Sequence, residues 1–195
     1  MKSTHRYHQL KKVIFEKLRT ELPPVYKYHS FEHTENMLAI LPQYVEPYDL
    51  DEEQIELLQV AILFHDLGFT VDWKNHESKS VKFAEMLLPD FNYSSMEIEL
   101  VQNLIMATKI PQTPENIMQS IICDVDLDYL GRDDYFSRRE LLYQEWLALG
   151  IVEDREEWAD KELKFLANHQ FHSIFGKMHR QPVLQKHVKS ISSNR

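Results

Sequence analysis

Glycine is scarce in this chain, and that scarcity constrains its fold more than any other feature of the sequence. Only four of the 195 residues are glycine, whereas Leu, Glu, Lys, Gln and Met, which favour helices, are plentiful. Apolar residues recur three and four positions apart, which is the spacing of one face of a helix. The sequence therefore predicts an all-α fold, with helices joined by short turns and no β-sheet.

Signals for helix ends divide the chain into segments. Four pairs of residues are typical of helix starts: Asp51 with Gln54, Ser94 with Glu97, Thr113 with Pro114, and Ser137 with Glu140. Gly131 and Gly150 each follow an apolar-periodic stretch, where a left-handed helix cap favours glycine. These signals predict helices over residues 4–21, 31–45, 52–66, 77–88, 95–108, 114–130, 137–149, 154–175 and 182–191.

The charge and the apolar runs of the chain argue against two classes of partner. The net charge of -9 disfavours stable binding of nucleic acid, because such binding needs Lys and Arg to neutralise backbone phosphates. No stretch approaches the ~20 apolar residues that span a bilayer, so no membrane partner is expected. The segment Met1 to Leu10 is polar and lacks the apolar core of a signal peptide, which predicts a cytoplasmic protein.

Candidate metal ligands occur where apolar helical faces turn polar. Cys123 is the only cysteine, so a metal site must use imidazole and carboxylate groups rather than a thiolate cluster. His65 continues the apolar stripe of the helix expected at 52–66, and Asp66 follows it. His33 lies one turn before the apolar stripe of an earlier helix. Two helices thus present a histidine where a core residue is expected.

A third inward-facing polar residue is expected in the helix predicted at 114–130. Ile117 and Ile121 set its apolar face, and a further step of three residues reaches Asp124. Asp126 lies about 200° around the helix from Asp124, so the two carboxylates cannot face one cation. We therefore predict that Asp124 faces the histidines and that Asp126 has no ligand role.

Two interpretations of these residues stay open on spacing alone. No Lys or Arg lies on the same helical faces, and an unpaired buried carboxylate costs several kcal/mol. One divalent cation held by two imidazoles and two carboxylates would solve this problem, with the ligands His33, His65, Asp66 and Asp124. Such a mixed shell favours Mn, Fe, Co, Ni or Zn over Mg. The alternative is that both histidines are core residues hydrogen-bonded to the two aspartates.

Three segments that contain these residues resemble a known family. Tyr28 to Thr34 (YHSFEHT), Ala61 to Gly68 (AILFHDLG) and Asp124 to Gly131 (DVDLDYLG) resemble, in order, the signature segments of the HD-domain superfamily. Its members are helical, metal-dependent phosphohydrolases and phosphodiesterases. The resemblance implies a compact helical bundle and places the family's ligands on the same four residues. We expect one domain over 1–195, with a metal-bearing core at about 26–131 and C-terminal helices at about 132–195 packed on it.

The resemblance also implies residues that meet the substrate. His76 lies where many members carry a histidine that contacts phosphate, protonates a leaving oxygen or ligates a second metal; the alternative is a solvated histidine at a helix start. Asp66 and His76 are the expected catalytic residues. Where members with two metals carry another histidine, this chain has none, so one metal is expected, and Thr108 or Lys109 is expected to meet the phosphate.

Two further residues have weaker assignments. His29, one turn before His33, is expected to support a ligand or to belong to a lid, unless it is simply exposed. Asp128 shares the face of Asp124 and is expected either to orient a ligand or to hydrogen-bond to a neighbouring helix.

The predicted function is therefore that of a metal-dependent phosphoric ester hydrolase. The resemblance implies a small phosphorylated substrate, with a nucleotide preferred, and a metal-activated water. A phosphodiesterase of the same fold, a nucleotide-binding or sensing module without turnover, and a helical interaction protein with structural histidines are the alternatives. Homo-oligomer formation is left open.

Overall fold

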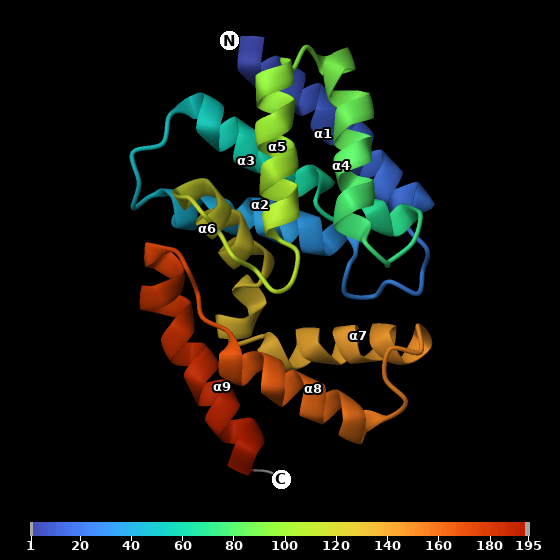
Figure 1. Ribbon diagram of the computed structural model, residues 1–195, viewed down its shortest axis with the longest axis vertical. Helices are drawn as coiled ribbons and strands as arrows, with labels where there is room; N and C mark the ends of the chain where they lie inside the picture. Colours follow the sequence, from blue (N-terminus) through green and yellow to red (C-terminus); the bar gives the residue numbers. More distant parts are fainter. Residues whose placement is uncertain (1, 194–195) are drawn as a thin grey trace.

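The computed structural model describes residues 2–193, and within that range every regular element is helical (Figure 1). The long helices are α1 (Lys2–Glu21), α2 (Phe31–Val45), α3 (Glu52–Phe64), α4 (His76–Leu87), α5 (Ser95–Ala107), α6 (Ile117–Asp126), α7 (Tyr135–Ala148), α8 (Arg155–Asn168) and α9 (Gln181–Ser193). Short helical turns are η1 (Leu67–Thr70), η2 (Leu88–Phe91), η3 (Asp128–Gly131) and η4 (Gly176–Arg180). The predicted all-α fold is confirmed.

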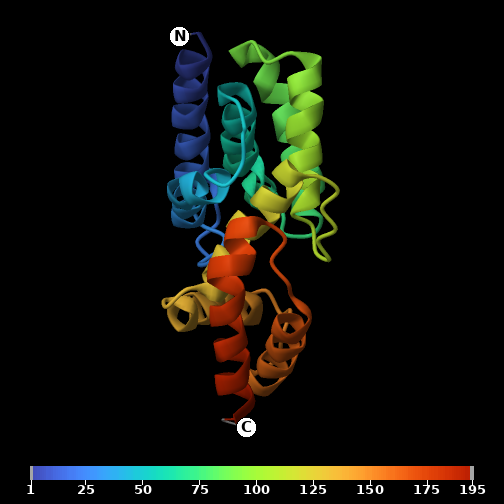
Figure 2. The ribbon, with the colours of Figure 1, turned by 90° about the vertical axis from the view of Figure 1, so that its left-hand side faces the viewer.

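Helix α3 is the central element of the larger hydrophobic core. Its residues from Leu57 to Phe64 are mostly buried, and it packs against α1, α2, α5 and α6. Two views show α1–α5 at one end of the molecule and α7–α9 at the other, with α6 and η3 leading from one to the other (Figures 1 and 2). A second apolar cluster, which includes Tyr135 and Phe171, lies in the C-terminal part. The buried position of α3 places the residues at its C-terminal end in the interior.

Local capping signals account well for the helix starts in the N-terminal half. Asp51 with Gln54 and Ser94 with Glu97 each form both hydrogen bonds of a capping box. The first five predicted helices agree with α1–α5 within two residues at each end. Within residues 2–193, no helix combines the length and the apolar character that crossing a membrane requires.

Two predicted helices are longer than the helices that the structure shows. The predicted helix 114–130 is α6 followed by the separate turn η3, because Asn116 caps the start and Leu127 leaves helical geometry. The predicted helix 154–175 ends as α8, and His169 is already extended. Seven residues, 169–175, then lead back across α6 to η4 and α9.

Several predicted end signals are wrong. Helix α7 begins at Tyr135, after Asp134, rather than after Ser137. Gly150 has the expected positive φ of 65°, but Gly131 does not. Gly131 instead packs so closely on the backbone and Cβ of Arg180 that a side chain would not fit. Its small size serves a tertiary contact rather than a helix cap.

Candidate metal centre

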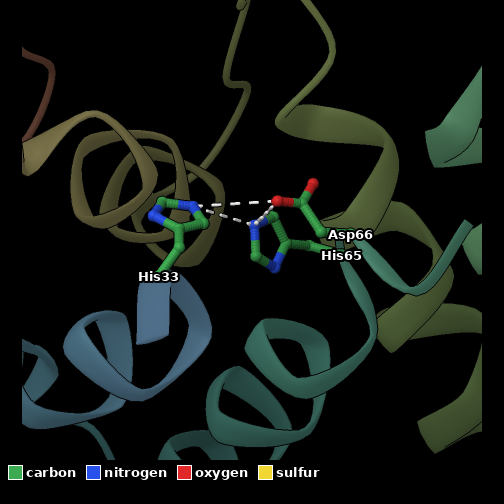
Figure 3. Close-up of side chains that lie close together, drawn as sticks. All are labelled: His33, His65 and Asp66. Carbon is green, nitrogen blue, oxygen red and sulfur yellow. Dashed lines mark hydrogen bonds and ion pairs between the residues drawn. The ribbon is translucent and has the colours of Figure 1, made fainter. Parts of the chain in front are cut away.

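Three buried side chains converge where α2 meets the end of α3. His33 lies in the first turn of α2, His65 caps the C-terminal end of α3, and Asp66 follows it (Figure 3). His65 Nε2 lies 3.3 Å from His33 Nε2 and 3.1 Å from Asp66 Oδ2, and His33 Nε2 lies 3.8 Å from the same oxygen. Atoms that bind one ion at about 2.0–2.2 Å are themselves about 3–4 Å apart. This group could therefore hold a metal ion.

The turn after α3 orients these groups through backbone contacts. His65 Nδ1–H donates to the carbonyl of Ile62 at 2.8 Å, which leaves Nε2 as the ligand atom of the neutral ring. The Ser80 hydroxyl donates to the carbonyl of His65 at 2.7 Å and accepts from the amide of Gly68 at 2.8 Å. A Cβ on Gly68 would collide with the backbone of His76. The start of α4 is thus pressed against the His-Asp turn.

Asp126, at the end of α6, supplies the fourth converging group. Its Oδ1 lies 3.2 Å from His33 Nε2 and 3.6 Å from His65 Nε2. The prediction from sequence gives this residue no ligand role. The structure places it beside both imidazoles.

Asp124, the predicted fourth ligand, points away from the histidines. Its carboxylate accepts hydrogen bonds from the amides of His172 and Ser173 and from the Ser173 hydroxyl, at 2.5–3.1 Å. Burial raises the pKa of Asp124, against the effect of these hydrogen bonds. The prediction fails because Ile117 is 50% exposed and does not mark the inward face of α6.

Asp124 and Asp126 nevertheless point in different directions from α6, as their spacing along a helix predicts. Ile121, Ile122 and Val125 form the buried side of α6, and the two aspartates project on different sides of it. The predicted orientation is therefore reversed: Asp126 faces the histidines, and Asp124 faces the C-terminal segment.

The electrostatics of the group suit a cation. Burial opposes charge on His65, but the carboxylates of Asp66 and Asp126 and the hydrogen bond to Ile62 together outweigh burial and raise the pKa of His65 to about 9. Burial lowers the pKa of His33, although Asp126 works against this effect. Asp66 is also buried, yet the charge of His65 holds the pKa of Asp66 well below its usual value. The carboxylates thus favour a positive charge at this place, which a divalent ion would supply.

An unsatisfied oxygen supports the same interpretation. Asp66 Oδ2 is buried and accepts no hydrogen bond of good geometry from the described residues. A buried carboxylate oxygen normally has such partners, and their absence is costly. The donor set of two imidazole nitrogens and two carboxylates therefore fits a divalent transition ion.

His76 and His29 lie beside this group. His76 Nδ1 is hydrogen-bonded to the carbonyl of Trp73, and its Nε2 lies 3.5 Å from Asp66 Oδ1 and 3.7 Å from Glu77 Oε1. His29 is partly exposed, and its Nδ1 lies 2.5 Å from Glu145 Oε1 on α7. Burial opposes charge on His29, but Glu145, together with Asp66 and Asp126, outweighs burial and raises the pKa of His29. His29 thus links the site to α7.

The remaining predicted residues are placed differently. Thr108 is buried, and its hydroxyl donates to the carbonyl of Ile105, whereas Lys109 is exposed. Asp128 accepts hydrogen bonds from Tyr44 and Arg180 at 2.7 and 2.6 Å. Of the two roles expected for Asp128, the structure therefore shows hydrogen bonds to neighbouring helical segments rather than the orientation of a metal ligand.

A cavity of about 260 Å³ adjoins the centre. Its lining includes Asp66, His76 and Asp126 from the centre, together with Thr108 and side chains of α7 and α8. Lys109 does not belong to this lining. A small molecule in the cavity would therefore meet two carboxylates and one imidazole of the centre.

Sequence reasoning missed Glu145 and Glu77 as well as Asp126. Glu145 is 1% exposed and lies three residues after Leu142 on the inner side of α7, so helical spacing could have revealed it. Glu77 is also buried, but it lies in the first turn of α4, where an acidic residue is ordinary. No local signal in the sequence distinguishes Glu77 from an acidic residue that simply interacts with the dipole of its helix.

Comparisons with models of protein families, with curated proteins and with solved structures gave no match.

Proposed function

We propose that the protein is a metal-dependent phosphoric ester hydrolase of the HD-domain superfamily, acting on a small phosphorylated substrate. One observation carries the proposal: His33, His65, Asp66 and Asp126 converge from three helices beside a cavity. The order of the three signature-like segments along the chain supports the same class.

The proposed ligands are these two imidazoles and two carboxylates. The mixed nitrogen and oxygen set suits Mn, Fe, Co, Ni or Zn better than Mg. Such an ion, when bound, supplies Lewis acidity toward a phosphoryl oxygen and lowers the pKa of a water. The chain itself supplies the placement of the ligands, and the burial of His33, His65 and Asp66 keeps bulk water away from these three.

His76 is the proposed general acid. Its Nδ1–H is held by the carbonyl of Trp73, so Nε2 is the ring atom left for the leaving oxygen. The residue lies on the cavity wall beside Asp66, and its side chain is 21% exposed. Thr108 also lines the cavity, but its hydroxyl proton is used by Ile105, so it can offer the phosphate only limited hydrogen bonding.

The test is phosphate release by protein that has been stripped of metal and reloaded with Mn, Co or Zn. We expect turnover of at least one compound in a panel of phosphate monoesters and diesters. His76→Asn should keep the metal content and lower turnover by about 10²–10⁴-fold. Failure to take up metal would contradict the proposal. Binding of a nucleotide without release of phosphate would instead support a sensing module.

A further inference from the structure

The cavity beside the centre is small and has a largely apolar wall. Its volume of about 260 Å³ is below the roughly 300–1,000 Å³ typical of ligand pockets. Helices α7 and α8 contribute one wall, which includes Leu142, Trp146, Trp158 and Phe165. Burial of an apolar group there would be favourable, because it removes apolar surface from water. The cavity suits a ligand with one compact apolar part.

Arg139 and Lys161 in the cavity lining each have an ion-pair partner, although the buried Arg139 Nε lacks a hydrogen-bond partner among the described residues. Arg139 forms an ion pair with Glu162, which also accepts a hydrogen bond from the Tyr135 hydroxyl at 2.5 Å. Lys161, which is exposed, lies 3.1 Å from Glu157. Arg139 and Lys161 are the only Arg or Lys side chains among the described residues that line the cavity.

Among the residues that the structure describes, the same lining contains four carboxylates, those of Asp66, Glu77, Asp126 and Glu162. A cation at the centre would neutralise part of this charge and could receive one phosphate. A second anionic group would lie among acidic side chains with no unpaired cation among the Arg and Lys residues of the lining, and burial of an unpaired charge is costly. The cavity therefore opposes a substrate with two separated negative groups.

We propose that this cavity selects phosphate monoesters whose alcohol part is an uncharged aromatic or apolar group of one or two rings, and that it rejects substrates with a second anionic group. This inference rests on the proposed function, because it assumes that the phosphate lies at the metal centre. It adds the substrate class, which the centre alone does not specify.

Binding of phosphonates that cannot be hydrolysed tests the inference without turnover. Metal-loaded full-length protein is titrated with methylphosphonate, phenylphosphonate, naphthylphosphonate and phenylene bisphosphonate, by calorimetry and by tryptophan fluorescence. We expect phenylphosphonate and naphthylphosphonate to bind at least about tenfold more tightly than methylphosphonate, through contact with Trp146 and Trp158. Phenylene bisphosphonate should bind more weakly than phenylphosphonate.

A charge variant tests the second half of the inference. Glu162→Gln keeps the shape of the side chain but leaves the Arg139 charge unbalanced. It should therefore reduce the ratio of the Kd of phenylene bisphosphonate to the Kd of phenylphosphonate by about tenfold. Glu140→Gln is the matched control, because it removes a carboxylate from a surface pair with Arg155 outside the cavity lining. That control should leave the ratio of the two Kd values unchanged.

The outcomes separate this inference from the proposed function. Equal binding of methylphosphonate and naphthylphosphonate, or tighter binding of the bisphosphonate by unaltered protein, would overturn the inference even if phosphate release is observed. Selective aryl binding without hydrolysis of any ester would uphold the cavity assignment and contradict the proposed enzyme. If Glu162→Gln fails to fold, the series on unaltered protein still decides the question.

Discussion

Asp124 and Asp126 are two residues apart, and helical geometry gives them different partners. Asp126 faces two imidazoles, whereas Asp124 receives hydrogen bonds from His172 and Ser173. Loss of a residue that only hydrogen-bonds to a metal ligand weakens metal affinity by about 10–100-fold. Asp126→Asn removes a proposed ligand itself, so it should weaken metal affinity by more than that. Asp124→Asn should keep metal affinity and lower the free energy of unfolding by about 1–3 kcal/mol, because buried donors lose their acceptor.

Metal titration calorimetry and urea unfolding, each on both variants, check this pair of expectations. The two variants are isosteric with the unaltered protein and remove the same charge, so each is the control for the other. Loss of metal binding in Asp124→Asn with retention in Asp126→Asn would mean that the centre lies on the other side of α6.

His169 provides a prediction for acid stability. Its side chain is half-buried, its Nε2 has no hydrogen-bond partner among residues 2–193, and burial lowers its pKa from 6.5 to about 4. The unfolded chain therefore binds a proton between these values that the folded chain refuses, so stability falls as pH decreases from about 6.5 toward 4. The loss approaches about 1.4 kcal/mol per pH unit within that window.

His169→Gln should remove this part of the acid sensitivity. Free energies of unfolding at pH 7 and at pH 5 are compared for the variant and the unaltered protein. Between pH 7 and pH 5, the free energy of unfolding should decrease less for the variant than for the unaltered protein. Parallel losses in both proteins would show that His169 is protonated in the folded state.

Residue periodicity alone locates most of the candidate centre. His33, His65 and Asp66 come together as predicted, since α3 is buried along most of its length and its stripe is unambiguous. Periodicity misassigns Asp124 because α6 is short and its first turn is exposed. Ile117 therefore gives a misleading direction for the inward face.

At the scale of helices, local signals are reliable where the helix end is set by the chain itself. The capping boxes at Asp51 and Ser94 are examples, since their hydrogen bonds join residues three apart. The end of α8 is different: the segment after it turns away to donate hydrogen bonds to Asp124, about 50 residues earlier in the sequence. Such a contact has no local signature.

The contact between the His-Asp turn and α4 yields a prediction at this scale. Gly68→Ala places a methyl group against the backbone of His76, so the start of α4 must shift and His76 with it. Turnover should fall, while metal affinity changes less, because the hydrogen bond from His65 to Ile62 is independent of this contact. Phosphate release and metal titration measure the two effects.

Gly150→Ala is the matched control for that substitution. Gly150 has φ of 65° and open space around its Cα, so alanine there strains only the backbone, at a cost of roughly 1–2 kcal/mol. It should reduce stability and leave turnover per folded molecule unchanged. A fully active Gly68→Ala protein would argue against His76 as the general acid.

For the whole molecule, the centre lies at the junction between the N-terminal helices and α7–α9. Asp124 and Asp128 on the N-terminal side bind Ser173 and Arg180, and Glu145 on α7 reaches back to His29. The C-terminal helices thus close the cavity that the centre opens into. The sequence predicts that these helices pack on the metal-bearing part, but it does not predict these particular ion pairs and hydrogen bonds, because each joins residues far apart in the chain.

A metal ion that joins α2, the turn after α3 and α6 should stabilise the whole fold. Metal at about 100 times its Kd adds about 2.7 kcal/mol to the free energy of unfolding. For a chain of this size, that corresponds to a rise in Tm of about 5–10 °C. Thermal unfolding followed by circular dichroism, with Mn, Co or Zn and after chelation, measures the shift. Asp126→Asn should show a much smaller rise, whereas Asp124→Asn should start from a lower Tm and keep the full rise. An equal rise in all three proteins would place the stabilising ion elsewhere.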